Sequence, residues 1–566
     1  MMRMILIILV FGVMLSGCAN NQTADMIIKN ANIYAVDTTY NGDAIAIKDG
    51  KIWKAGKWDE LESFSDENTE IIDAQGNFLM PGFIEGHGHY GGLGTSLINL
   101  NFLKSSSWES IVDDVSDKVQ MTPKGSWIIG RGWHQEKWDS IPKPNVYKYP
   151  YHNTLSAVSQ DNPVVLYHAS GHALFANQKA MQEVGITRET PNPVGGEIVR
   201  DKNGEAIGVF EERAMDLFMR KYADYQASLD KKVVDSIWLK AMHLAEQDCL
   251  SKGVTSFQDA GSKFVDLDKY EKLAKDNALK VRLWVMMREP LKALESNASK
   301  YKKINLGGYY YTCNAIKTDI DGALGSYGAW LLESYNDKPG FKGQNTTDIA
   351  EIKGIADLAV KLDLQLCVHA IGDRGNRTVL DLFEDEMRRH PEKKDWRWRI
   401  EHAQHLHPDD IIRFGKSKII ASMQGIHCTS DAPYVIQRLG EKRAKEGAYA
   451  WRSLLDSGAV VTNGTDTPIE DINPIENFYA SVTRKKQGGG EAFFPEQVMT
   501  RKEAIYTYTL ANAYAAFEEN IKGSLKTGKL ADMVILSNDL IRCEESEILN
   551  TQVLYTIVGG KVQYKK

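Results

Sequence analysis

Eight short apolar runs recur along the chain, and stretches of helical length separate most of them. The runs cover residues 78–89, 253–261, 281–287, 314–322, 364–373, 397–404, 419–427 and 460–468. Strands that alternate with helices favour a parallel sheet, and eight such units favour closure into a barrel. The sequence therefore predicts an α/β fold, a (β/α)8 TIM barrel, over residues 81–515.

The two ends of the chain and one long gap do not fit the repeating unit. Residues 25–80 and 516–566 hold short alternating runs broken by Gly, Asp and Asn, which predict a small β-sandwich formed by both termini. Residues 91–252 separate the first two barrel runs, and this is far too long for a βα loop. We therefore predict an inserted subdomain at about 95–250, which leaves the barrel on the catalytic side as a lid or substrate-binding wall.

The N-terminus has the pattern of an export signal. Arg3 precedes an apolar stretch at 4–15 that is too short to span a bilayer but has the length of a secretory signal. Residues 15–18 (Leu-Ser-Gly-Cys) resemble a bacterial lipobox. That resemblance implies a signal peptide at 1–17, lipidation of Cys18, a tether at 18–24 and an extracytoplasmic lipoprotein held at the outer membrane. The alternative is a plain signal peptide with a chance cysteine at its end.

Composition excludes several other classes. The formal net charge is −7 and no Lys/Arg stripe is present, which argues against nucleic acid as a partner. No C-x-x-C spacing occurs, so neither a zinc ribbon nor a thioredoxin-like site is indicated. The cysteines other than Cys18 are expected to be buried free thiols: Cys249, Cys313, Cys367, Cys428 and Cys543.

Residue types that bind metals stand at the ends of several barrel runs. They are His87, His89, His369, His402 and Asp466. His87 and His89 are two residues apart, so both point to one face of a strand. A lone histidine in an apolar strand is commonly a packed core residue. However, this ordered set at the C-terminal ends of the first, fifth, sixth and eighth runs predicts a metal site, and its N/O donors suit zinc.

Several segments resemble the signature segments of the amidohydrolase superfamily. They are residues 81–89 (PGFIEGHGH), 369–373 (HAIGD), 399–404 (RIEHAQ) and 464–468 (GTDTP). Residues 314–326, 170–181 and 421–431 are similar to the branch called amidohydrolase family 3, which includes N-substituted formamide deformylases. The resemblance covers about residues 25–560 and implies hydrolysis of C–N or C–O bonds at a site with one or two divalent ions.

The resemblance also implies a role for each metal-site residue. His87, His89 and Asp466 bind the more buried ion, and His369 and His402 bind the second. Lys317 matches the lysine that is carboxylated and bridges both ions in binuclear members; the alternative is a cationic lysine beside one metal. A metal-activated hydroxide attacks the substrate, and Asp466 passes the proton to the leaving amine.

Other residues are candidates for the pocket. His427 donates to the substrate carbonyl or is structural, and His172 matches a family histidine that reaches the pocket. His134, where the branch has Asp, His168 and Asp321 are further candidates. Four tryptophans of the insertion are expected in its core rather than as a substrate platform: Trp108, Trp127, Trp133 and Trp138.

Three functions remain open at this stage. The first is hydrolysis of an amide, formamide, carbamate or cyclic amide of a small molecule. The second is ester hydrolysis, deamination or decarboxylation at the same site, because fold and metal do not decide between these reactions. The third is a catalytically silent scaffold, against which the complete ligand set argues. Zinc is the expected metal, with iron, manganese and cobalt as alternatives, and a homodimer is the family-level expectation.

Overall fold

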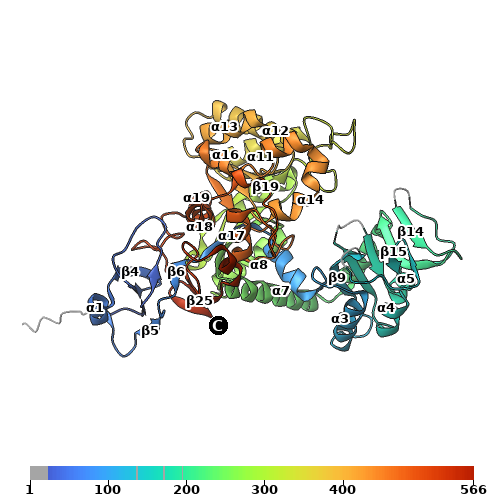
Figure 1. Cartoon of the computed structure of the whole chain (residues 1–566), viewed down its shortest axis with the longest axis horizontal. Helices are drawn as coiled ribbons and strands as arrows, with labels where there is room; N and C mark the ends of the chain where they lie inside the picture. The colour runs from blue at the N-terminus through green and yellow to red at the C-terminus, as the bar shows by residue number, and fades with distance from the viewer. Residues whose placement is uncertain (1–22, 136–137, 170–172, 194–195) are drawn as a thin grey trace, which may run out of the picture.

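The computed structural model describes residues 23–135, 138–169, 173–193 and 196–566, and a parallel sheet lies at its centre (Figure 1). The strands of this sheet are β7 (Phe83–Gly88), β16 (Val254–Ser262), β17 (Arg282–Met287), β19 (Tyr311–Asp319), β20 (Gln365–Ala370), β21 (Arg399–His402), β22 (Ile420–Met423) and β23 (Val461–Asn463). They pair in sequence order, and each overlaps one of the eight predicted runs; β19 begins before its run, at Tyr311, and β16 ends just after its run, at Ser262. The predicted barrel strands are therefore confirmed.

The sheet curves until its last strand meets its first. The N–H of Asp466, just after β23, donates to the carbonyl of His87 in β7 at 2.7 Å. The N–H of His89 donates to the carbonyl of Thr467 at 2.7 Å, in the same register. A Cβ at Gly464 would lie 2.5 Å from the backbone nitrogen of His87, so only glycine allows this approach. The result is a nearly closed barrel.

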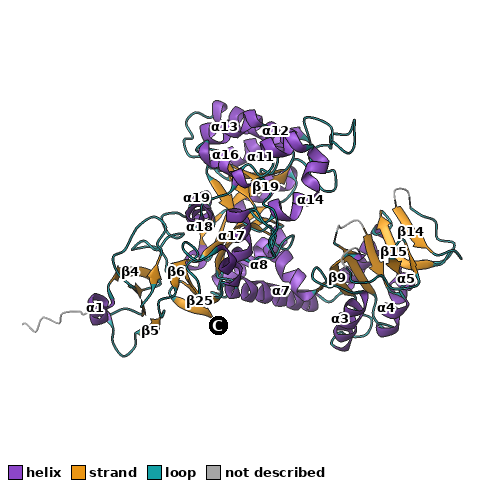
Figure 2. Ribbon diagram, in the orientation of Figure 1, coloured by secondary structure: helices purple, strands orange, loops and turns teal. Residues whose placement is uncertain are grey.

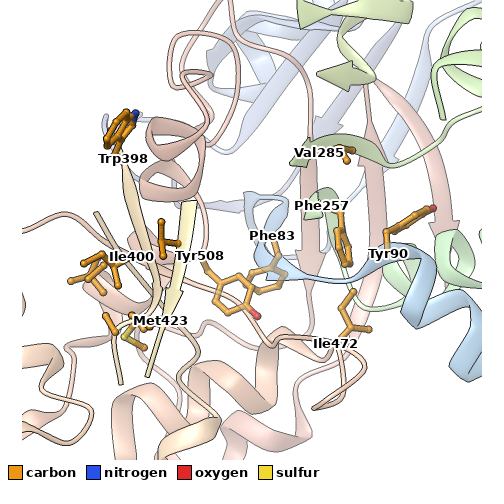
Figure 3. Packing of buried hydrophobic residues seen from close by; sticks show 14 of the residues in the cluster. Phe83, Tyr90, Phe257, Val285, Trp398, Ile400, Met423, Ile472 and Tyr508 are labelled. Atoms are coloured by element: carbon orange, nitrogen blue, oxygen red, sulfur yellow. The ribbon is translucent and has the colours of Figure 1, made fainter. Parts of the chain in front are cut away.

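Helices follow most of the barrel strands and cover the outside of the sheet (Figure 2). They include α8 (Phe264–Lys275), α9 (Leu291–Tyr301), α11 (Ile349–Leu362), α12 (Asp373–Arg389), α13 (Pro408–Ser417), α14 (His427–Leu439), α15 (Glu441–Gly447), α16 (Trp451–Asp456), α17 (Pro474–Thr483), α18 (Arg501–Thr507) and α19 (Leu510–Ala515). In α11 the buried face is formed by residues at helical spacing, Ile352, Ile355, Ala356 and Ala359. Side chains between sheet and helices form the main core, in which Phe83 meets Tyr508 edge to face at 5.7 Å (Figure 3).

The segment between β7 and β16 forms a separate sheet with its own helices. Its strands, in spatial order, are β14 (Gly196–Arg200), β15 (Ala206–Glu212), β13 (Ala173–Ala176), β12 (Val164–His168), β9 (Ile128–Trp133) and β8 (Leu100–Asn101). Trp108, Trp133 and Trp138 are buried together on one side of this sheet, as expected of core residues. In Figure 1 this sheet lies to the right of the barrel, and α7 (Lys231–Ser251) connects it to barrel strand β16.

The ends of the chain form two small sheets, and the second of them contains strands from both ends. One holds β1 (Met26–Lys29), β3 (Ala44–Lys48), β4 (Lys51–Gly56) and β5 (Glu70–Asp73); the other holds β2 (Asn32–Ile33), β6 (Phe78–Pro81), β24 (Met533–Leu536), β25 (Val553–Val558) and β26 (Lys561–Lys565). A common apolar cluster includes residues of both sheets. That they form a separate sandwich domain, and the predicted domain limits, stay predictions.

The predicted run at 78–89 is two strands rather than one. It divides at Pro81-Gly82 into β6, in the small sheet, and β7, in the barrel. The N–H of Gly82 still donates to the carbonyl of Asp532, beside β24, whereas the N–H of Phe83 donates to the carbonyl of Gly253, beside β16 in the barrel. Pro81, which has no N–H to donate, stands at the end of the first pairing.

Two further predictions concern the cysteines and the N-terminus. The five cysteines of the described residues are free, and all but Cys543 are buried. Within that part of the chain no helix has the length and apolar character needed to cross a membrane. Cys18 and the apolar stretch before it lie outside the described residues.

Candidate metal centre

One cavity at the C-terminal end of the barrel strands collects the predicted ligands. Its volume is about 490 Å³. All six predicted metal-binding residues line it: His87, His89, Lys317, His369, His402 and Asp466. Asp319 and Asp321 line it too, as does Arg288, which sequence reasoning did not single out.

Three of these residues have the spacing of ligands around one ion. Asp466 Oδ1 lies 3.2 Å from His89 Nε2 and 3.6 Å from His87 Nε2. Atoms bound tetrahedrally to zinc at 2.0–2.1 Å are about 3.3 Å apart, so the spacing fits. His87 Nε2 is buried and has no hydrogen-bond partner among the described residues, which a buried polar atom rarely tolerates without a ligand. The residues present therefore fit a metal ion.

Hydrogen bonds from the strands below set which ring nitrogen of two histidines is free. His87 Nδ1 lies 2.5 Å from Glu401 Oε2, and a carboxylate only accepts, so the proton is on Nδ1. His402 Nδ1 lies 2.7 Å from Gln424 Oε1, which has the same effect. Both rings therefore present an unprotonated Nε2 to the cavity. Glu401 is itself held by the buried Arg399, whose Nε lies 2.7 Å from Glu401 Oε1.

His427 is held differently, although it is close to the same atoms. The ligand atoms of His402, His427 and Asp466 all lie within 4.8 Å of one another. Gln404 Nε2 lies 3.0 Å from His427 Nδ1, and an amide N–H donates, so the ring proton is on Nε2. His427 Nε2 is buried and has no hydrogen-bond partner among the described residues. This arrangement makes His427 a donor rather than a ligand.

Lys317 lies among the histidines and contacts an acid. Its Nζ lies 2.9 Å from Asp319 Oδ1, and Arg288 also pairs with Asp319. Burial would raise the pKa of Asp319, but Lys317 and then the neighbouring His369 and Arg288 hold it well below its usual value.

Asp321 supports the strand ends beside His369. Its carboxylate accepts from the backbone N–H groups of Ile371 at 2.9 Å, Gly372 at 2.8 Å and Trp330 at 2.9 Å. Oδ1 lies 3.6 Å from His369 Nε2. Burial raises the pKa of Asp321 to about 7 despite these donors.

The electrostatics favour the protonation states that metal binding needs. Burial, then Lys317, lowers the pKa of His369 to about 3, and burial likewise lowers the pKa values of His87 and His402. Burial would raise the pKa of Asp466, but its interaction with His89 and the imidazoles of His87 and His402 lower it below its usual range. Neutral imidazoles and an ionised carboxylate are the forms that bind a divalent ion.

The candidates in the insertion are not brought to this cavity. The rings of His134 and His168 pack at a tilt of 49° with centroids 4.5 Å apart, and His168 packs edge-on to Trp133. Among the described residues, the cavity lining includes neither of them. His172 lies outside the described residues.

Comparisons with known proteins show the family of this chain. A family model described as "Amidohydrolase family" matches residues 70–564. Protein LONG AFTER FAR-RED 3 of Arabidopsis thaliana is 32% identical over 554 residues, which are 96% of this chain and 92% of that protein. N-substituted formamide deformylase of Arthrobacter pascens is 27% identical over 572 residues, with 96% and 99% covered. A structure from Pyrococcus furiosus, described as an uncharacterized metal-dependent hydrolase, has a TM-score of 0.72 at 25% identity and covers 91% of this chain and 100% of its own.

Proposed function

Because this chain belongs to the amidohydrolase family, we propose that it hydrolyses a C–N bond of a small molecule, namely an amide, formamide or cyclic amide. The observation that carries the proposal is the set of neutral imidazoles around one ionised carboxylate at the barrel mouth. We propose zinc as the metal, because these nitrogen and oxygen donors suit it. When bound, a divalent ion supplies an acidified water near neutral pH and polarises the scissile carbonyl.

Asp466 is the residue we assign to proton transfer. Its carboxylate is ionised, which is the form that can accept a proton from the attacking water. The same carboxylate then delivers the proton to the leaving nitrogen, because an amine must be protonated to depart. The loop after β23 fixes its position through the bond from its own N–H to the carbonyl of His87.

His427 is the residue we assign to the substrate carbonyl. Gln404 Nε2 donates a hydrogen bond to His427 Nδ1. The ring proton of His427 is therefore on Nε2, where it is available to donate. A donor already fixed where negative charge develops stabilises the transition state more than the ground state. A ring nitrogen of His427 lies within 4.8 Å of the ligand atoms of His402 and Asp466, which supports a donor close to the reacting carbonyl.

Lys317 is the residue we assign to carboxylation when two ions are bound. An ammonium beside two divalent cations is strongly repelled, and the neutral amine reacts with carbon dioxide to give an anion that can bridge them. Lys317 is paired with Asp319, but Arg288 pairs with that acid as well. Asp319 therefore keeps a cationic partner if the charge of Lys317 is lost, which supports the carbamate.

The substrate class is the part of the proposal that a screen tests directly. The deformylase of Arthrobacter pascens, to which this chain is similar over 96% of its length, supports an N-formyl or related amide. Zinc-loaded protein should release amine from a panel of N-formyl, N-acyl and cyclic amides, with matched esters, amino-heterocycles and carboxylic acids as controls. Turnover of only the esters, amino-heterocycles or acids would replace the C–N proposal by ester hydrolysis, deamination or decarboxylation.

We also propose that the enzyme is anchored outside the cytoplasm through a lipid on Cys18, at the outer membrane. The lipobox-like residues 15–18 support this location. The substrate would then be a small molecule met outside the cytoplasm, and neither nucleic acid nor a protein partner is required; a homodimer is proposed only by family analogy.

A further inference from the structure

A second, larger cavity has no lining residue in common with the metal centre. Its volume is about 820 Å³. Residues 405–409 after β21, the first turn of α12, residues 332–336 and the start of α15 form its walls. A polar cavity of this size is in the range of small-molecule sites.

His405 is the feature that points to a ligand here. The side chain lines the cavity and the residue is 2% exposed, and neither ring nitrogen has a hydrogen-bond partner among the described residues. Burial lowers the pKa of His405 to about 3, so the ring is neutral and offers one donor and one acceptor. The ring packs edge-on to Tyr449 with centroids 5.3 Å apart, and this contact leaves both ring nitrogens without a hydrogen bond.

Arg443, in the lining of the same cavity, supplies a charge. Its Nε donates to the carbonyl of Leu439 at 2.6 Å and its Nη2 to that of Ser334 at 2.8 Å. These bonds fix the guanidinium, whereas Nη1 is buried without a partner among the described residues. A fixed guanidinium with an unused N–H is suited to a carboxylate.

The outer part of the cavity has the opposite charge. Four exposed acids line it, Glu333, Asp409, Glu441 and Glu446, against one exposed base, Lys442. Further in, Asp373 accepts from the N–H groups of Leu332 at 2.8 Å and Arg374 at 2.9 Å through Oδ1. Burial raises the pKa of Asp373, and these two N–H groups together with the nearby Arg443 and His407 only partly oppose it.

We propose that this cavity binds a small zwitterion, with its carboxylate against Arg443 and His405 and its ammonium toward Asp373 and the acidic rim. A simple anion is disfavoured because it would pass four exposed acids, and a simple cation because it would leave Arg443 Nη1 and His405 unpaired. The site is distinct from the proposed hydrolytic centre and does not depend on its reaction.

Three probes of equal chain length test the charge requirement: 4-aminobutyrate, butyrate and butylamine. Binding to the metal-loaded protein is measured by saturation-transfer NMR and by calorimetric titration. We expect saturable binding of 4-aminobutyrate, and at least about tenfold weaker binding of the other two, since each lacks one charged contact. Equal binding of butyrate, equal binding of butylamine, or no binding of 4-aminobutyrate would each overturn the proposal.

Variants place the binding in this cavity rather than at the metals. Arg443→Gln and His405→Phe should each weaken 4-aminobutyrate binding about tenfold or more, because each removes a buried contact to the carboxylate. Lys445→Gln, an exposed position on α15 outside the cavity lining, should leave it unchanged. Circular dichroism and metal content check that each variant is folded and loaded. Unchanged binding in both folded cavity variants would contradict the assignment.

Discussion

At the scale of single residues, the direction of a few backbone angles decides which side chains reach the metal centre. His402 has φ = 74° and Asp466 has φ = 56°, both in the left-handed region that non-glycine residues rarely adopt. Strand alternation would place His402 on the face opposite to Glu401. With the left-handed turn at the end of β21, His402 lines the cavity while Glu401, buried beneath it, contacts His87; a backbone cost of this kind is found at functional sites.

The His427 assignment gives a residue-scale prediction that separates donor from ligand. His427→Gln should lower kcat by roughly one hundredfold, as loss of a transition-state donor does, while metal content stays that of the wild type. Asp466→Asn should lower turnover at least as much and weaken metal binding as well, because that residue has both roles. Steady-state kinetics and metal analysis of the same samples check this. If His427→Gln loses an ion, His427 is a ligand and the donor role is wrong.

Lys317 gives a second residue-scale prediction. Protein assembled with two ions per chain and ¹³C-bicarbonate should show a carbamate carbon signal, because a carbamate is stable only where cations hold it. Lys317→Ala should lose that signal and bind one ion. One ion in both proteins, with no labelled carbon, would leave Lys317 as a cation paired with Asp319.

Most of the residues of the site can be predicted from the sequence, and there is a physical reason why the others cannot. His87, His89, His369, His402, Lys317 and Asp466 were identified because each stands at or near a strand end, and the cavity contains all six. Glu401, Gln424 and Gln404 were missed as positioning residues. Their role depends on contacts with residues of other strands, and the sequence of one strand does not reveal those contacts. His134 and His168 are candidates for the pocket from the sequence, but their rings pack against each other within the insertion.

At the scale of elements, the helices are held to the barrel by apolar faces that also bury a few charges. In α7, Glu246 is 7% exposed and accepts from the backbone N–H of Lys280 at 2.6 Å. Burial raises the pKa of Glu246, and the N–H of Lys280 only partly opposes this. The folded state therefore holds a proton that the unfolded chain has already released, so this residue destabilises the fold increasingly as pH rises above its unfolded pKa.

Glu246→Gln tests that element-scale effect. Glutamine keeps an acceptor for the N–H of Lys280 and has no charge, so the variant should melt at a higher temperature than the wild type at about pH 8. The difference should shrink toward zero near about pH 4, where the unfolded glutamate is also protonated. Glu295→Gln on the exposed face of α9 is the matched control. A difference that is constant with pH, or a less stable variant at the higher pH, would contradict the burial argument.

The eight barrel strands could be predicted as elements because each is a short apolar run flanked by polar residues. The division of the first run was not foreseen. Pro81 and Gly82 stand within a continuous apolar stretch, and only the pairing of β6 with β24, far away in sequence, separates the two strands. The local pattern of apolar residues does not predict a strand partner that lies so far away in sequence.

At the scale of the whole molecule, the inserted sheet and the terminal sheets flank the barrel. The inserted sheet and the terminal sheets lie on opposite sides of it in Figure 1. Arg131 of the insertion donates to the carbonyl of Pro468 at 2.7 Å, in the loop that follows Asp466. The insertion therefore contacts the loop that follows Asp466, although the cavity lining includes none of the described residues of the insertion.

The location of the molecule is tested through Cys18. Expressed in a two-membraned bacterium, the protein should incorporate labelled palmitate and fractionate with the outer membrane, and globomycin should block its processing. Cys18→Ser should abolish the label and release the protein from membranes, because the acyl chains are its proposed anchor. Equal membrane association of Cys18→Ser would show that the lipoprotein proposal is wrong.

The central claim is that the histidines and Asp466 at the barrel mouth hold a catalytic metal, and metal analysis tests it most directly. Elemental mass spectrometry is applied to purified wild type and to the double variant His87→Ala/His89→Ala, with circular dichroism as the check on folding. We expect at least one divalent ion per chain in the wild type and its loss, together with amine release, in the folded double variant. A folded wild type without stoichiometric metal, or a double variant that retains both metal and turnover, would contradict the account.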